Sequence, residues 1–410
     1  MKRTPAWLAC LLIGVAVAAS MPADGSSPAA SGRATAVVAA SNDFGFRLLH
    51  QLKAGQGDNA VISPISLAIA LAMAQNGAAG STRTAMAKTL GLGAMSDAAV
   101  NGAYRELLHS FAGADPATQL DIANALWLQT GFAIVPDFVA ANRKFYGAEV
   151  ANVDFQNHPD RAVGKINHWA SRKTHGRITS ILDPNPSFRF VVTDAVYFKG
   201  RWVAPFDKKQ TQPQHFYPAD GRTVDVPMMR REGEYSYFDD ANLQAIEMFY
   251  GNTRFAMYIF LPRKPYTLAE LMKSLDQHRW SELTAKLEGG EQKGTIAIPR
   301  FELRWGGTLN DDLKAIGMGV AFDSDADFSR AHLPPPPLVI DEVVQKTFMK
   351  VDEEGTEAAA VSAVAVGLMA TMGGPRPFEM IVDHPFFCAI VERQTGAILF
   401  AGAITDPQAK

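Results

Sequence analysis

Apolar and polar positions along this chain follow two periods, one typical of helices and one typical of strands. Apolar residues recur at helical spacing at Phe44, Leu48, Leu49 and Leu52. The segment Ser41-Asn42-Asp43 precedes them and can cap the start of this helix. Short apolar runs predict strands at residues 188–198, 254–261, 295–298, 386–391 and 397–401. Because helices and strands are mixed without regular alternation, the sequence predicts an α+β fold.

The stretch from residue 352 to 372 has a pattern that fits two structures. After an acidic start it passes through Gly355 into a run of small, uncharged residues. Propensity alone predicts a buried helix or strand over residues 358–370. A period of two gives one face that is wholly uncharged, beginning Thr356, Ala358, Ala360, Ser362. Such small side chains can lie in water as a loop and can also enter a sheet.

The segment Glu353-Glu354-Gly355-Thr356-Glu357-Ala358-Ala359-Ala360 closely resembles the hinge of the reactive-centre loop of the serpins, a family of serine-protease inhibitors. Other segments are similar to serpin signatures in the same order: residues 59–67, 125–128, 166–169, 195–202, 260–262, 316–318, 326–329, 384–386 and 399–402. Together they identify the chain as a member of the family over residues 38–406. The resemblance implies the serpin fold, with helices packed around three β-sheets and an exposed reactive-centre loop at about residues 353–377.

The resemblance also implies where the bait bond lies. Counting along the loop from Glu353 places it between Met369 and Ala370, with Leu368, Met372 and Arg376 as rival bait residues. The implied hinge consists of Glu353, Gly355, Thr356, Glu357, Ala358, Ala359, Ala360 and Ser362. An unbranched apolar side chain such as Met369 suits an elastase-, chymotrypsin- or subtilisin-like pocket, whereas a trypsin-like pocket needs a cation.

Two polar clusters of the family match residues of this chain. The shutter, which controls the opening of the central sheet, matches Ser63, Ser66, Asp194 and Gln345. The breach, where the loop first enters the sheet, matches Trp202, Thr211, Arg300 and Glu353. Asp194 and Gln345 replace the asparagine and histidine of many serpins, and a glutamine amide can still donate to a carboxylate. The alternative is that the shutter residues are ordinary buried polar groups.

The function that the resemblance implies is suicide-type inhibition of serine endopeptidases. The protease acylates the bait bond, and insertion of the cleaved loop into the central sheet traps the acyl-enzyme. From Gly355 to Met369 is fourteen steps, or roughly 45 Å of extended strand. Two alternatives remain: a non-inhibitory serpin that acts as a carrier or binding protein, and a cross-class inhibitor of cysteine proteases.

The sequence lacks the common enzyme motifs. It contains no Gly-x-Ser-x-Gly elbow, no His-Glu-x-x-His and no Cys-x-x-Cys, and its nine histidines are scattered. We therefore expect a protease inhibitor rather than an enzyme, with no metal and no cofactor. The net charge of -3 argues against a nucleic-acid partner. The helical stretch 101–111 offers only Arg105 and His109, so no glycosaminoglycan site is expected, and we expect a monomer without membrane contact.

The N-terminus predicts export. Lys2 and Arg3 precede an apolar core at residues 6–19, and Ala16-Val17-Ala18 supplies a small-x-small cleavage pattern. We expect a signal peptide at residues 1–19, a flexible linker at 20–37 and a single serpin domain at 38–406. The protein would be secreted, either extracellular or periplasmic. Cleavage would leave Cys388 as the last cysteine, and its strand-like surroundings predict a packed core thiol.

Overall fold

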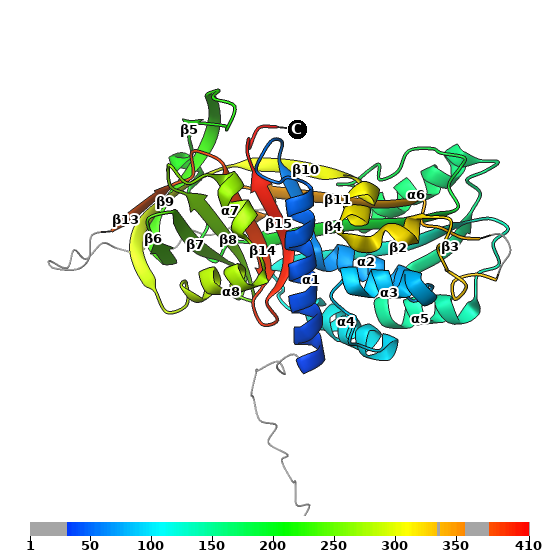
Figure 1. Cartoon of the computed structure of the whole chain (residues 1–410). Coiled ribbons are helices and arrows are strands. Elements are labelled where there is room, and N and C mark those ends of the chain that lie inside the picture. Colours follow the sequence, from blue (N-terminus) through cyan, green and yellow to red (C-terminus); the bar gives the residue numbers. More distant parts are fainter. Residues whose placement is uncertain (1–30, 334–336, 357–376, 410) are drawn as a thin grey trace, which may run out of the picture.

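Two β-sheets and the helices around them make up the fold (Figure 1). The computed structural model describes residues 31–333, 337–356 and 377–409. Each of the five apolar runs predicted as strands overlaps one observed strand. The mixture of sheets and helices confirms the α+β class.

The larger sheet has nine strands, in the order β1-β15-β14-β8-β7-β6-β9-β13 with β5 paired to β6. Their bounds are β1 (Ala60–Ile62), β5 (Gln212–Phe216), β6 (Val224–Asp239), β7 (Leu243–Tyr250), β8 (Phe255–Pro262), β9 (Glu291–Pro299), β13 (Phe378–Ile381), β14 (Phe386–Glu392) and β15 (Ala397–Ile404). The long strand β6 pairs with β5 and β9 over most of its length and with β7 over residues 236–239. Because β6 is hydrogen-bonded to β5, β7 and β9, these nine strands form one continuous sheet.

The second sheet, called here the central sheet, has the order β10-β11-β4-β2-β3, with β12 paired to β4. Its strands are β2 (Thr118–Gln129), β3 (Glu149–Val153), β4 (Phe190–Arg201), β10 (Phe301–Thr308), β11 (Glu342–Val351) and β12 (Gly355–Thr356). The pair β11 and β4 is parallel, whereas β10 and β2 flank it in antiparallel pairings.

The helices are α1 (Gly32–Gln51), α2 (Pro64–Gln75), α3 (Gly80–Thr89), α4 (Asp97–Phe111), α5 (Pro136–Tyr146), α6 (Pro159–Lys173), α7 (Leu268–Ser274), α8 (Gln277–Ala285) and α9 (Asn310–Leu313). Helices α2 to α6 gather around the central sheet, whereas α7 and α8 lie against the larger sheet (Figure 1). Every residue of α2 is buried, which explains why this helix is apolar on all sides.

The predicted start of the first helix was wrong. Helix α1 begins at Gly32, and the Ser31 hydroxyl caps it by accepting the amide N–H of Ala34. Ser41 and Asn42 lie inside the helix and are buried. Ser41 shares a hydrogen bond with the Tyr104 hydroxyl, and Asn42 bonds to the backbone at the start of β15. Residues 32–37, expected in the linker, are therefore helical. The expected signal peptide lies outside the described residues.

Alternate residues of β4 face two different cores. Val192, Val196 and Phe198 join the large core on the α2 side of the central sheet. Val191 and Ala195 join a smaller core that contains α6 residues such as Trp169. The central sheet is therefore covered on both faces, and a strand added to it must supply side chains that fit both cores.

Cys388 lies on β14 and is fully buried, as the sequence predicts. Burial raises the pKa of its thiol to about 12, so the group stays protonated and unreactive at neutral pH. Within the described residues, no helix has the length and apolar character needed to cross a membrane.

Candidate functional site

The site centres on the seam, the parallel pairing of β4 residues 191–197 with β11 residues 342–348. Beyond Phe348 and Tyr197 the two strands part. There β12 takes the place beside β4, with Gly355 opposite Arg201 and Thr356 opposite Gly200. This pairing is antiparallel, so the chain leaves β11, turns back and starts down the edge of β4. The first two residues after the turn already occupy the mouth of the seam.

The turn between β11 and β12 depends on glycine. Asp352 and Gly355 exchange backbone hydrogen bonds of 2.8 and 3.2 Å, and the Asp352 carboxylate accepts the amide of Glu354 at 3.0 Å. Gly355 has φ of +149°, and a Cβ at this position would lie 2.0 Å from the carbonyl oxygen of Gly200. No other residue fits there without moving the strand. Steric exclusion of a Cβ thus explains why this position of the hinge is a glycine.

Thr356 is held by Tyr250, a contact that the sequence did not reveal. Its side chain is 1% exposed, and its hydroxyl shares a 2.8 Å hydrogen bond with the Tyr250 hydroxyl. The Tyr250 ring stacks on Trp202, with centroids 4.3 Å apart and planes at 14°. Burial raises the pKa of Tyr250 well above its usual value, so its hydroxyl keeps its proton. Trp202 also donates from its indole to the Asp352 carbonyl at 3.0 Å.

The four residues assigned to the breach do lie together. The Glu353 carboxylate accepts a 2.8 Å hydrogen bond from Thr211 and lies 3.4 Å from an Arg300 guanidinium nitrogen. Trp202 bonds through its backbone N–H to the Glu354 carbonyl at 3.0 Å. The structure therefore brings these side chains to one place, at the start of β12, and their part in loop entry stays a prediction.

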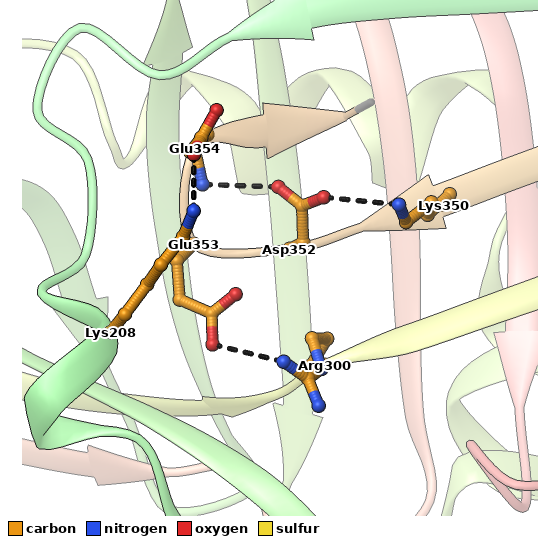
Figure 2. A pocket seen from close by; sticks show the side chains of 6 residues that line it. All are labelled: Lys208, Arg300, Lys350, Asp352, Glu353 and Glu354. Atoms are coloured by element: carbon orange, nitrogen blue, oxygen red, sulfur yellow. Dashed lines mark hydrogen bonds and ion pairs between the residues drawn. The ribbon is translucent and has the colours of Figure 1, made fainter. Parts of the chain in front are cut away.

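A charged surface pocket opens beside the breach (Figure 2). It is lined by three cations and three carboxylates: Lys208, Arg300, Lys350, Asp352, Glu353 and Glu354. Lys208 pairs with Glu354, and Lys350 lies 3.4 Å from Asp352. The side chains of Lys208 and Arg300 are 66% and 48% exposed, so water screens these two cations and their ion pairs add little stability.

The shutter residues form one buried network across the seam. The Asp194 carboxylate accepts the Ser66 hydroxyl at 2.5 Å and the Gln345 amide at 2.6 Å. The Gln345 amide also exchanges bonds of 3.0 and 3.1 Å with the backbone of Ser63, next to the first residue of α2. All four residues are fully buried. The structure thus contains a hydrogen-bonded bridge in which glutamine supplies the donor, and the part of these residues in opening the sheet stays a prediction.

Asp194 is a carboxylate in an apolar interior. Burial raises its pKa to about 7, against the hydrogen bonds from Ser66 and Gln345, which lower it. Asn124 of β2 is the register partner of Asp194 and donates to the Ser66 carbonyl at 3.2 Å. Sequence reasoning missed Asn124, because a single asparagine in a strand-like run carries no signal of its partner.

The bait bond and most of the hinge lie outside the described residues. These are Glu357, Ala358, Ala359, Ala360, Ser362, Met369 and Ala370, together with Leu368, Met372 and Arg376. After this segment the chain is described again from residue 377 and enters β13, which pairs with β9. There Phe378 stacks on Tyr237 with ring centroids 3.7 Å apart. The segment therefore joins the mouth of the seam to the larger sheet.

Among the described residues, no group of histidine, cysteine, aspartate and glutamate side chains could hold a metal ion.

Family, sequence and structure comparisons all match this chain to one family of proteins. The family described as "Serpin (serine protease inhibitor)" matches residues 39–407. An uncharacterized serpin-like protein of Thermococcus kodakarensis is 37% identical over 379 residues, covering 92% of this chain and 87% of that protein. Iripin-8 of Ixodes ricinus is 34% identical over 373 residues, covering 89% and 92%. The crystal structure of human thyroxine-binding globulin in complex with thyroxine aligns with a TM-score of 0.83 at 26% identity, covering 92% of this chain and all of that one (100%).

Proposed function

The chain belongs to the serpin family, and we propose that it is a suicide-type inhibitor of serine endopeptidases. Members of this family are in general protease inhibitors rather than enzymes. The observation that carries the proposal is the position of β12. Gly355 and Thr356 pair with the end of β4, between two parallel strands that part at this point.

The register of β12 supports further insertion. If its pairing with β4 continued in steps of two, Ala358, Ala360 and Ser362 would come opposite Phe198, Val196 and Asp194. These positions face the large core, where bulk or charge would be costly. A new strand of roughly a dozen residues, at about 1 kcal/mol net per hydrogen bond, would gain on the order of 10 kcal/mol. The uncleaved fold is then a kinetically trapped state.

The proposed mechanism uses this stored free energy against the protease. The protease serine attacks the Met369 carbonyl, the peptide bond to Ala370 breaks, and the new amine at Ala370 leaves. Met369 is then joined to the protease as an ester. Insertion from Thr356 onward carries that ester roughly 45 Å along the seam before water can cleave it. The small hinge residues favour this outcome, because insertion must be faster than deacylation.

The side chain of Met369 indicates which class of serine protease is inhibited. Its flexible apolar side chain fits elastase-, chymotrypsin- or subtilisin-like pockets. Exchange for a cation, as in Met369→Arg, is expected to move the preference to trypsin-like enzymes. An unchanged preference would place the bait bond at Leu368, Met372 or Arg376 instead.

The test is to mix the protein with elastase, chymotrypsin and subtilisin. We expect a covalent complex that survives SDS and a released peptide that begins at Ala370, identified by mass spectrometry. Proteases that stay fully active while they cut the loop would overturn the proposal. A panel that includes a papain-like enzyme also tests the cross-class alternative.

A second candidate function is that of a carrier. The similarity to thyroxine-binding globulin, solved with its bound thyroxine, favours it. A carrier does not need insertion, so its loop could be cut without a gain in thermal stability. A rise in the unfolding midpoint after cleavage therefore favours the inhibitor.

We further propose that the protein is secreted as a monomer. The signal-peptide pattern at residues 1–19 supports secretion. N-terminal sequencing of the exported protein should begin after residue 19, and a retained N-terminus inside the cell would contradict this.

A further inference from the structure

Asp194 and Gln345 face each other across the seam as register partners. Their 2.6 Å hydrogen bond is a side-chain link directly between the two strands that must separate when a strand enters. Through Ser66 and Ser63, the same two side chains also fix the start of α2 under the sheet. Any opening of the seam at this level must break the Asp194–Gln345 contact and change the surroundings of the carboxylate.

No counter-ion faces Asp194 from the described elements that pack around it. Asp194 shares its face with Asn124 of β2 and Gln345 of β11. The other charged residues of these three strands occupy positions of opposite parity and point to the other face: Asp121, Lys199, Arg201, Glu342, Lys346 and Lys350. Tyr197 also lies on that other face, and α2, β1 and β12 contain no titratable side chain.

The hydrogen-bond geometry accommodates both protonation states. As an anion, Asp194 accepts from both the Ser66 hydroxyl and the Gln345 amide. As a neutral acid, one oxygen can donate to the Ser66 hydroxyl while the other still accepts from Gln345. Asp194 therefore keeps both of its partners when it is protonated, and the closed seam no longer holds a desolvated charge.

We propose that Asp194 is a proton-operated latch: its neutral form holds the seam closed, and its ionised form favours separation of β4 from β11. Opening admits water to the carboxylate, and hydration favours the anion. In the closed state burial raises the pKa of Asp194 to about 7, from an ordinary value of 3.8. Between these two values the closed state binds more protons than the open state. Opening therefore becomes easier as the pH rises toward 7 and levels off above it.

Asparagine at this position has the same charge and the same donor and acceptor pattern as the neutral acid. Its side-chain NH₂ can donate to the Ser66 hydroxyl, and its oxygen can accept from Gln345. Asp194→Asn should therefore fold, keep the seam closed and remove the dependence on pH. Asp121→Asn is the matched control, because Asp121 lies on the neighbouring strand but on the opposite face.

The experiment is hydrogen–deuterium exchange of the β4 and β11 amides in the full chain, without protease, from pH 5 to 8.5. Rates are corrected for the intrinsic pH dependence of exchange. For the unmodified protein and for D121N, the opening constant should rise by up to tenfold per pH unit below 7 and level off above it. For D194N it should stay low and flat. His332, whose pKa is lowered by burial, is common to all three proteins and cancels in the comparison.

A flat profile in the unmodified protein, or an unchanged slope in D194N, would overturn the latch. The latch rests on the proposed function only in that opening of the seam serves inhibition. The two can fail separately: a pH-dependent seam in a protein that inhibits no protease leaves the latch standing and removes the inhibitor. Inhibition of a protease by a protein whose seam opens independently of pH would leave the inhibitor standing and remove the latch.

Discussion

The breach and the shutter lie on one seam but are built differently. At the breach, aromatic stacking and ion pairs surround the start of β12, and water reaches the cations Lys208 and Arg300. At the shutter, Asp194 and Gln345 are fully buried and join β4, β11 and α2. One end of the seam is already entered by two residues, and its middle is closed by a dry polar network. We infer that insertion begins easily and meets its main resistance at the shutter.

The largest effect is expected where the loop first enters. Thr356→Arg places a cation at a site that is 1% exposed and whose hydrogen-bond partner is the neutral Tyr250 hydroxyl. The cost of burying it is several kcal/mol, so insertion stalls and the inhibitor becomes a substrate. The number of inhibitor molecules consumed per protease inactivated measures this directly. Thr356→Ser keeps the hydroxyl and should inhibit normally; full inhibition by T356R would show that insertion does not pass through this site.

The next largest effect is expected at the shutter. Gln345→Leu leaves Asp194 without one donor and the backbone of Ser63 without its amide partner. We expect a loss of about 3 kcal/mol in the free energy of unfolding, measured with denaturant. The neighbouring Lys346→Met, on the other face of β11, should change it by less than about 1 kcal/mol. Equal effects of the two substitutions would remove the contrast between the shutter and the rest of the seam.

A smaller effect is expected from one hydroxyl at the breach. Tyr250→Phe removes the hydrogen bond to Thr356 but keeps the stack on Trp202. We expect a local loss of about 1 kcal/mol, seen as faster exchange of the Gly355 and Thr356 amides with little change in the rest of the sheet. Tyr258→Phe, which removes a hydroxyl bonded to Glu247 elsewhere, serves as the control. If both variants leave β12 unchanged, Tyr250 does not hold the hinge.

The smallest effect is expected for an ion pair whose cation is about half exposed to water. Arg300 is half exposed, and its distance to Glu353 is 3.4 Å, while Thr211 remains as the closer partner. Arg300→Met should lower stability by about 0.5 kcal/mol at low salt, and the difference should vanish in high salt. Unfolding curves at two salt concentrations measure this. A loss that persists in high salt would mean that the breach relies on charge more than the comparison with the shutter suggests.

The sequence predicts those parts of the site that are carried by local pattern or by the family motif. Apolar runs indicate the strands, and the glycine of the hinge turn sits where a Cβ would meet the Gly200 carbonyl. Tyr250 escaped prediction because it lies 106 residues from Thr356, and nothing local marks that contact. The start of α1 was misplaced because Ser41 and Asn42 have the residue types of a cap but are used in tertiary hydrogen bonds.

The central claim is that Gly355 and Thr356 are the start of a strand that is completed between β4 and β11. Its most direct test is a crystal structure of the protein after the loop has been cut. We predict that residues following Thr356 pair with β4 down to Asp194 and beyond, so that Gln345 is no longer opposite Asp194. A cleaved protein in which β4 and β11 are still paired over residues 191–197 and 342–348 would contradict the account.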